Sequence, residues 1–114
     1  MQLEDYFEFE KTNTKHGMAE EIRLKGTRVH IETIVHDFNE GGTAVQIQAN
    51  YPTVTLEQVF AAITYYLHNK AEVDGYIERG RKIADAYYQE YLQKGPFFLR
   101  DEALALKAAK AAHE

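Results

Sequence analysis

The stretch from Lys25 to Leu67 constrains the fold most, because apolar residues recur in it at helical spacing and stop signals interrupt them. The Gly41-Gly42 pair ends the first run. Two capping boxes, Thr43 to Gln46 and Thr55 to Gln58, predict the starts of two further helices. We therefore expect three short helices in succession. The apolar positions of the first run are Ile31, Ile34, Val35 and Phe38.

The third of these helices should have one buried side. We expect its inward residues to be Leu56, Val59, Phe60, Ile63, Tyr66 and Leu67, and its outward residues to be Glu57, Gln58, Ala61, Thr64, Tyr65 and His68. Three short helices with tight turns are typical of a helix-turn-helix, in which one helix enters a DNA groove. Small helical domains that bind no DNA share this pattern.

A β-hairpin is predicted before the helices. Residues 6–10 and 21–25 alternate apolar with charged side chains, and residues 12–17 between them are polar and end in glycine. An isolated hairpin is marginal in water, so it should lie against the helices or pair with a second subunit in a homodimer. In the following block, Gly26 should supply a turn conformation and Thr27 a local hydrogen bond, while Arg28 could contact phosphate or a partner.

The C-terminal part reads as a long helix that ends at Lys94 before Gly95-Pro96. A short apolar group follows at residues 97–99, and Asp101 should then cap an alanine-rich helical segment from Glu102 to Ala112. The apolar residues of the long helix recur every three or four positions, which is typical of a seam for another helix. We divide the chain into 1–80, a hairpin with a three-helix domain, and 81–114, a helical arm that a partner would order. The candidate partner-binding residues are Tyr87, Tyr88, Tyr91, Leu92, Phe97, Phe98 and Arg100.

Charge argues against tight, unaided DNA binding. The net charge is −5, and residues 32–75 hold one Lys or Arg against six Asp or Glu. DNA affinity depends largely on neutralised phosphates, and the third helix contains no Lys or Arg. If DNA is bound, the candidate phosphate contacts are Arg23, Lys25 and Arg28, and the candidate base contacts are Thr55, Gln58, Ala61 and Tyr65.

Catalytic and metal-binding patterns are missing from the 114 residues. The chain has no cysteine or serine, its five histidines are scattered, and no phosphate-binding glycine loop occurs. We therefore expect no enzyme activity, no metal and no cofactor. The acidic start and the lack of a long apolar run predict neither a signal peptide nor a membrane span, so the cytoplasm is the expected location.

Three blocks resemble the bacterial family catalogued as domain of unknown function 433: residues 22–29 (IRLKGTRV), 32–35 (ETIV) and 51–59 (YPTVTLEQV). The resemblance covers roughly residues 3–80. It implies a homeodomain-like or winged-helix core, and a role as an antitoxin of the VapB kind, encoded beside a toxin with a PIN-like nuclease fold.

Residues and resemblance together predict a mainly α-helical protein with an N-terminal hairpin, a helix-turn-helix-like core and a long C-terminal helix. The expected function is that of a homodimeric antitoxin, whose C-terminal third captures a PIN-like toxin and whose core could bind operator DNA. Two alternatives stay open. One is a stand-alone helix-turn-helix regulator of transcription, and the other is an assembly adaptor that binds no DNA.

Overall fold

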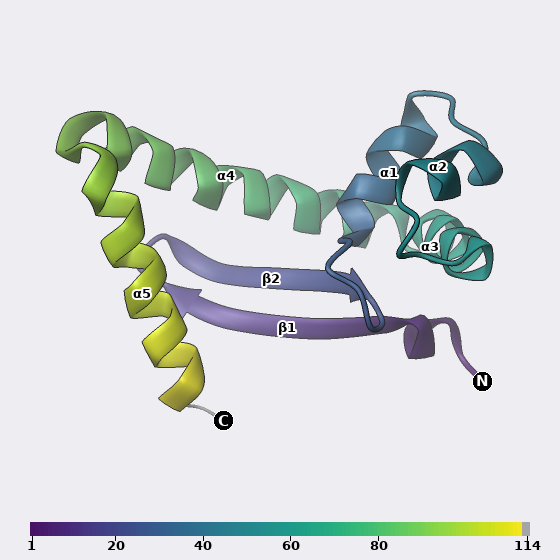
Figure 1. Ribbon diagram of the computed structural model, residues 1–114, viewed down its shortest axis with the longest axis horizontal. Coiled ribbons are helices and arrows are strands. Elements are labelled where there is room, and N and C mark those ends of the chain that lie inside the picture. Colours follow the sequence, from purple (N-terminus) through teal and green to yellow (C-terminus); the bar gives the residue numbers. More distant parts are fainter. Residues whose placement is uncertain (113–114) are drawn as a thin grey trace. The chain divides into compact units, whose positions relative to one another are not determined.

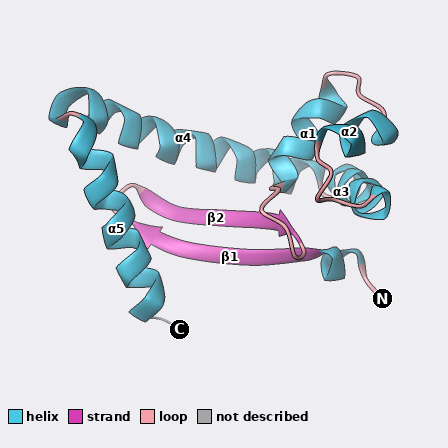
Figure 2. Ribbon diagram, viewed as in Figure 1, coloured by secondary structure: helices cyan, strands magenta, loops and turns pink. Residues whose placement is uncertain are grey.

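The protein, described from a computed structural model, is mainly helical and has an N-terminal antiparallel hairpin, as predicted (Figures 1 and 2). The structure describes residues 1–112, except the side chains at 96, 98, 99 and 109–112. In chain order the elements are the 3-10 helix η1 (Leu3–Tyr6), β1 (Phe7–Thr14), β2 (Gly17–Leu24), α1 (Ile31–Asn39), α2 (Ala44–Asn50), α3 (Leu56–His68), α4 (Lys70–Lys94) and α5 (Pro96–Ala112).

The chain forms two compact units. Unit 1 comprises residues 1–10 and 21–75, and unit 2 comprises residues 11–20 and the chain from residue 76 onward. The hairpin therefore contributes its base to unit 1 and its tip to unit 2. The boundary predicted after residue 80 lies inside α4.

The two strands are longer than their alternating runs indicated. The polar residues up to Thr14 belong to β1, and β2 begins at Gly17, so that only Lys15 and His16 form the turn. The Thr14 hydroxyl donates to the Gly17 carbonyl at 2.7 Å and accepts from the His16 N–H at 3.1 Å. The strands therefore extend into the segment predicted to be a turn, and the two bonds of Thr14 stabilise the short turn that remains.

The turn after β2 behaves as predicted. Gly26 has a φ of +76°, a conformation that side chains with a Cβ disfavour. The Thr27 hydroxyl donates to the Leu24 carbonyl at 2.9 Å and accepts from the Val29 N–H at 3.1 Å. Gly26 and Thr27 thus reverse the chain and direct it into α1, which confirms the structural role expected for this block.

The capping boxes predicted at the starts of α2 and α3 are present. At α2, the Thr43 hydroxyl accepts from the Gln46 N–H at 3.2 Å, and the Gln46 side chain accepts from the Thr43 N–H at 2.9 Å. Thr55 and Gln58 repeat the arrangement at α3, with distances of 3.1 and 2.9 Å. Because these bonds satisfy backbone groups that a helix start leaves unpaired, the two helices begin where the sequence indicated.

The core of unit 1 lies where α1, α2 and α3 pack together, as Figure 1 shows. The Tyr66 hydroxyl also donates to Asp74 at 2.9 Å and thereby joins α3 to the second turn of α4. The buried apolar residues of unit 1 are Phe7, Leu24, Ile31, Ile34, Val35, Ile47, Val54, Val59, Ala61, Ala62, Tyr65, Tyr66 and Val73.

The predicted faces of α3 were wrong in part. Ala61 and Tyr65, expected to face outward, are buried, whereas Leu56, Phe60 and Leu67, expected to face inward, are exposed. The reason is the hairpin: the ring of Phe7 lies 5.0 Å from that of Tyr65, and the ring of Phe9 lies 6.4 Å from it. Aromatic packing in this geometry buries the Tyr65 side of α3.

The C-terminal helices follow the predicted stop signal. α4 ends at Lys94, and Gly95, with a φ of +89°, donates its N–H to the Tyr91 carbonyl at 2.9 Å. Helix α5 then begins at Pro96, earlier than the expected start at Glu102, because proline is well suited to a first helical position. The apolar residues at 97–99 belong to the first turn of α5.

The cap of α3 gives a stability test. Thr55→Ala should lower the free energy of unfolding by about 1 kcal/mol, since it removes the hydroxyl that pairs with Gln58. Urea denaturation measures the loss. The matched control, Thr53→Ala, removes an exposed hydroxyl from the preceding turn and should change stability little. Equal losses in the two variants would contradict the assigned role of the cap.

Candidate interaction surfaces

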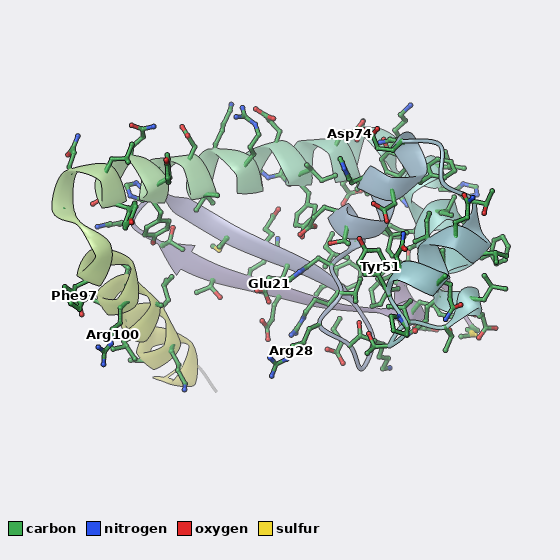
Figure 3. The ribbon with its side chains drawn as sticks, turned by 45° about the horizontal axis from the view of Figure 1, so that its top comes forward. Glu21, Arg28, Tyr51, Asp74, Phe97 and Arg100 are labelled. Carbon is green, nitrogen blue, oxygen red and sulfur yellow. The ribbon has the colours of Figure 1, made fainter. Side chains whose placement is uncertain are left out.

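The cations predicted to contact phosphate lie in different surroundings. The Arg23 guanidinium is 3.6 Å from both Glu8 and Glu10 and 3.9 Å from Glu21, and only 24% of its side chain is exposed. The three carboxylates of unit 1 therefore balance the positive charge of Arg23. Lys25 and Arg28 are exposed, and Arg28 projects away from the ribbon (Figure 3).

The residues predicted to read bases mostly support the fold. Thr55 and Gln58 form the cap of α3, and the Gln58 amide also donates to the Lys25 carbonyl at 3.0 Å. Ala61 and Tyr65 are buried, with 5% and 7% exposed. Buried side chains offer no contact to a base edge, so the structure does not bring these residues together as a DNA-reading face.

The exposed side of α3 is instead apolar. Leu56, Phe60 and Leu67 are 39%, 54% and 56% exposed, and Ile63 between them is half-buried. We call these four residues the α3 apolar row. Their spacing of four, three and four residues was visible in the sequence, but periodicity alone did not show which of the two apolar sides of this helix unit 1 covers. The row is typical of a protein contact surface.

In unit 2, the hairpin tip packs on α4 through charged and aromatic groups. Glu90 accepts from Lys15 at 2.8 Å and from Lys94 at 3.2 Å, and its other oxygen contacts His16 Nε2. The His16 ring packs edge-on against Tyr87, with centroids 4.8 Å apart. Tyr87, predicted to bind a partner, therefore contributes to the inside of unit 2.

Other predicted partner residues are accessible. On α4, Tyr88 and Leu92 are 53% and 58% exposed, and the Tyr88 ring stacks on the half-buried Tyr91 at 6.2 Å. On α5, Phe97 and Leu104 are 72% and 56% exposed. We call Tyr88, Leu92, Phe97 and Leu104 the α4–α5 apolar surface.

Arg100 adds a charge beside this surface. It lies three residues after Phe97 and four before Leu104, so the three residues share one side of α5. Figure 3 shows Phe97 and Arg100 projecting from the same side of the helix, and Arg100 is exposed. Phe98, the remaining predicted partner residue, lies outside the described side chains.

Unit 1 also has an open cavity of about 490 Å³ between the end of α1 and α2, lined by Asp37, Glu40, Gly42, Gln46, Ile47 and Asn50. Beside it, burial and the nearby Asp37 raise the pKa of Tyr51.

No group of three or more His, Cys, Asp or Glu residues in the described part of the chain could hold a metal ion. Among the described helices, none has the length and apolar character to cross a bilayer.

The contacts of Glu90 predict a pH dependence. The hydrogen bonds from Lys15, His16 and Lys94 lower its pKa from 4.5 to about 2. A carboxylate with a lowered pKa stabilises the fold fully above its unfolded pKa, and this contribution is lost as the pH falls through the folded value. Glu90→Gln should therefore destabilise unit 2 at about pH 5 and much less at about pH 2.

Urea denaturation over this range measures the difference between the wild-type protein and Glu90→Gln. The control Asp85→Asn changes an exposed carboxylate of the same helix and should show a smaller dependence on pH. A Glu90→Gln effect that stays constant across the range would contradict the role given to these contacts.

Comparison with known proteins agrees with the resemblance seen in the three sequence blocks. No curated protein and no solved structure was found to match the chain. A family model does match, over residues 15–66, which run from the hairpin turn nearly to the end of α3. Helices α4 and α5 lie outside the matched range. The matching model is that of the family described as protein of unknown function (DUF433), and it supports the family resemblance over residues 15–66.

Proposed function

We propose that the chain is a partner-binding protein of the antitoxin type, which captures a PIN-like nuclease toxin through the α4–α5 apolar surface. The carrying observation is that large apolar side chains are exposed on both C-terminal helices: Tyr88, Leu92, Phe97 and Leu104. Exposed apolar and aromatic side chains of this size are typical anchors of protein interfaces.

The charge of α5 suits such a toxin. Arg100 lies between Phe97 and Leu104 on one side of the helix, so a bound partner would meet a cation flanked by two apolar anchors. A guanidinium binds carboxylates in a bidentate manner, and a metal-dependent nuclease site is rich in carboxylates. In this proposal Arg100 covers the acidic site of the toxin, Phe97 fills a neighbouring pocket, and the chain itself has no catalytic role.

The proposal also implies a cellular location for the protein and a fold type for unit 1. A toxin that cleaves nucleic acid acts where nucleic acid is, so the pair would work in the cytoplasm. The three packed helices of unit 1 are compatible with the homeodomain-like or winged-helix core that the family resemblance implies. Operator binding would then require the toxin or a second subunit to contribute positive charge.

Partner capture can be tested by co-expressing the full chain with its neighbouring reading frame. Phe97→Glu should reduce affinity for the co-purified toxin by about 2 kcal/mol, or roughly thirtyfold, because it places a charge at an interface anchor. Isothermal titration calorimetry with the purified toxin measures the loss.

The matched control for that experiment is Ala105→Glu, which adds the same charge at an exposed position on a different side of α5 from Arg100. It should leave the affinity within about twofold of wild type. Equal affinities for the wild-type protein and Phe97→Glu would show that α5 is not the capture surface.

The alternative, a stand-alone helix-turn-helix regulator, fits the charges less well. The exposed side of α3 offers Leu56, Phe60 and Leu67 with no Lys or Arg, and Arg23 is paired within unit 1. Only Lys25 and Arg28 of the predicted phosphate contacts are exposed.

We therefore expect the protein alone to bind its upstream DNA duplex weakly at physiological salt, with a shallow dependence on salt concentration, because few phosphates are neutralised. Fluorescence anisotropy across a salt titration measures both quantities, and Arg28→Ala should change them little. Tight binding with a steep slope, lost in Arg28→Ala, would favour the regulator.

A further inference from the structure

The rest of unit 1 does not cover the α3 apolar row, since Leu56, Phe60 and Leu67 are exposed. The side of the helix that adjoins the row is buried, with Val59 and Ala62 at 0% exposed and Tyr66 at 2%. The opposite side is buried too, with Tyr65 at 7% exposed. Apart from Gln58 and an exposed polar strip of Glu57, Thr64 and His68, α3 is apolar, a pattern typical of helices that are covered on more than one side. Since unit 1 leaves the row exposed, a second surface should cover it.

We propose that a second copy of this chain packs on the α3 apolar row, with the two α3 helices antiparallel across a two-fold axis. The row is self-complementary in this arrangement. Its positions run four, three and four residues apart, so antiparallel pairing sets Leu56 against Leu67 of the second copy and Phe60 against Ile63 of the second copy. Each large side chain then meets another apolar side chain.

Polar groups beside the row favour the same arrangement. Glu57 and His68 lie on one side of the row, near opposite ends of α3, and both are exposed. Antiparallel pairing places Glu57 of each copy beside His68 of the other, so that an imidazole N–H can donate to a carboxylate at two places. Parallel pairing would bring equal ends of the two helices together, and the carboxylate would have no imidazole beside it.

The net acidity of the chain does not oppose this contact. Of the six acidic residues in 32–75, only Glu57 lies on α3. Depletion of charge at the centre and polar groups at the rim are typical of protein–protein interfaces. A DNA duplex is a poor occupant by the same count, because α3 has no cation to neutralise phosphate.

The first test is the oligomeric state of the full-length protein, measured by sedimentation equilibrium. We expect a dimer for the wild-type protein and a monomer for Phe60→Glu, which puts a charge at the middle of the row. Tyr88→Glu is the matched control, since Tyr88 is 53% exposed against 54% for Phe60 but lies on α4. It should remain dimeric. Circular dichroism checks that each variant keeps its helices, and Leu67→Glu replaces Phe60→Glu if that variant does not fold.

A monomeric wild-type protein would overturn the proposal, and so would a dimer that Phe60→Glu and Leu67→Glu leave intact. The first result would indicate that another segment of the same chain, or a different protein, covers the row. Phe60→Glu should still bind the toxin, so loss of the dimer and loss of toxin capture are separable results.

The second test examines the direction of pairing. The natural chain has no cysteine, so introduced thiols are unique. In the antiparallel dimer, Glu57 lies beside His68 of the second copy, whereas the two Glu57 positions are about 14 Å apart along the axis. A short bis-maleimide should therefore cross-link the double variant Glu57→Cys/His68→Cys into dimers, and neither single variant. Cross-linking of a single variant as efficient as that of the double variant would contradict antiparallel pairing.

Discussion

The packing of the hairpin base against α3 determines the arrangement of unit 1. Phe7 places its ring 5.0 Å from Tyr65, and the Lys25 carbonyl accepts a hydrogen bond from the Gln58 side chain. Both contacts hold the base of the hairpin on the same helix, one through apolar burial and one through a polar bond at the N-terminal end of α3. They select the Tyr65 side of α3 as the inner side and leave the α3 apolar row outside.

The distribution of charge supports protein contacts better than DNA contacts. Arg23 lies among Glu8, Glu10 and Glu21, so a cation that could have met phosphate instead balances carboxylates of the same unit. The exposed side of α3 is apolar, and the exposed sides of α4 and α5 carry further large apolar groups. Two separate apolar surfaces, one in each unit, are therefore available for the two proposed partners, a second copy and a toxin.

Local features were predictable from the sequence to within a few residues. The caps at Thr43 and Thr55, the glycine conformation at Gly26 and the end of α4 at Lys94 all depend on neighbours within four residues. The start of α5 was placed too late, because the apolar residues after Pro96 were assigned to an irregular segment although proline often opens a helix.

The exposure of the candidate residues was predictable only where it follows from composition. Tyr88, Leu92, Phe97 and Arg100 lie on a segment with few apolar residues to bury, and they are exposed as expected. The sequence by itself determined where the helices begin and end, because hydrogen bonds between near neighbours set those points. Only the tertiary structure decided that Ala61 and Tyr65 face inward while Phe60 faces outward, since α3 has two apolar sides and the distant hairpin aromatics choose between them.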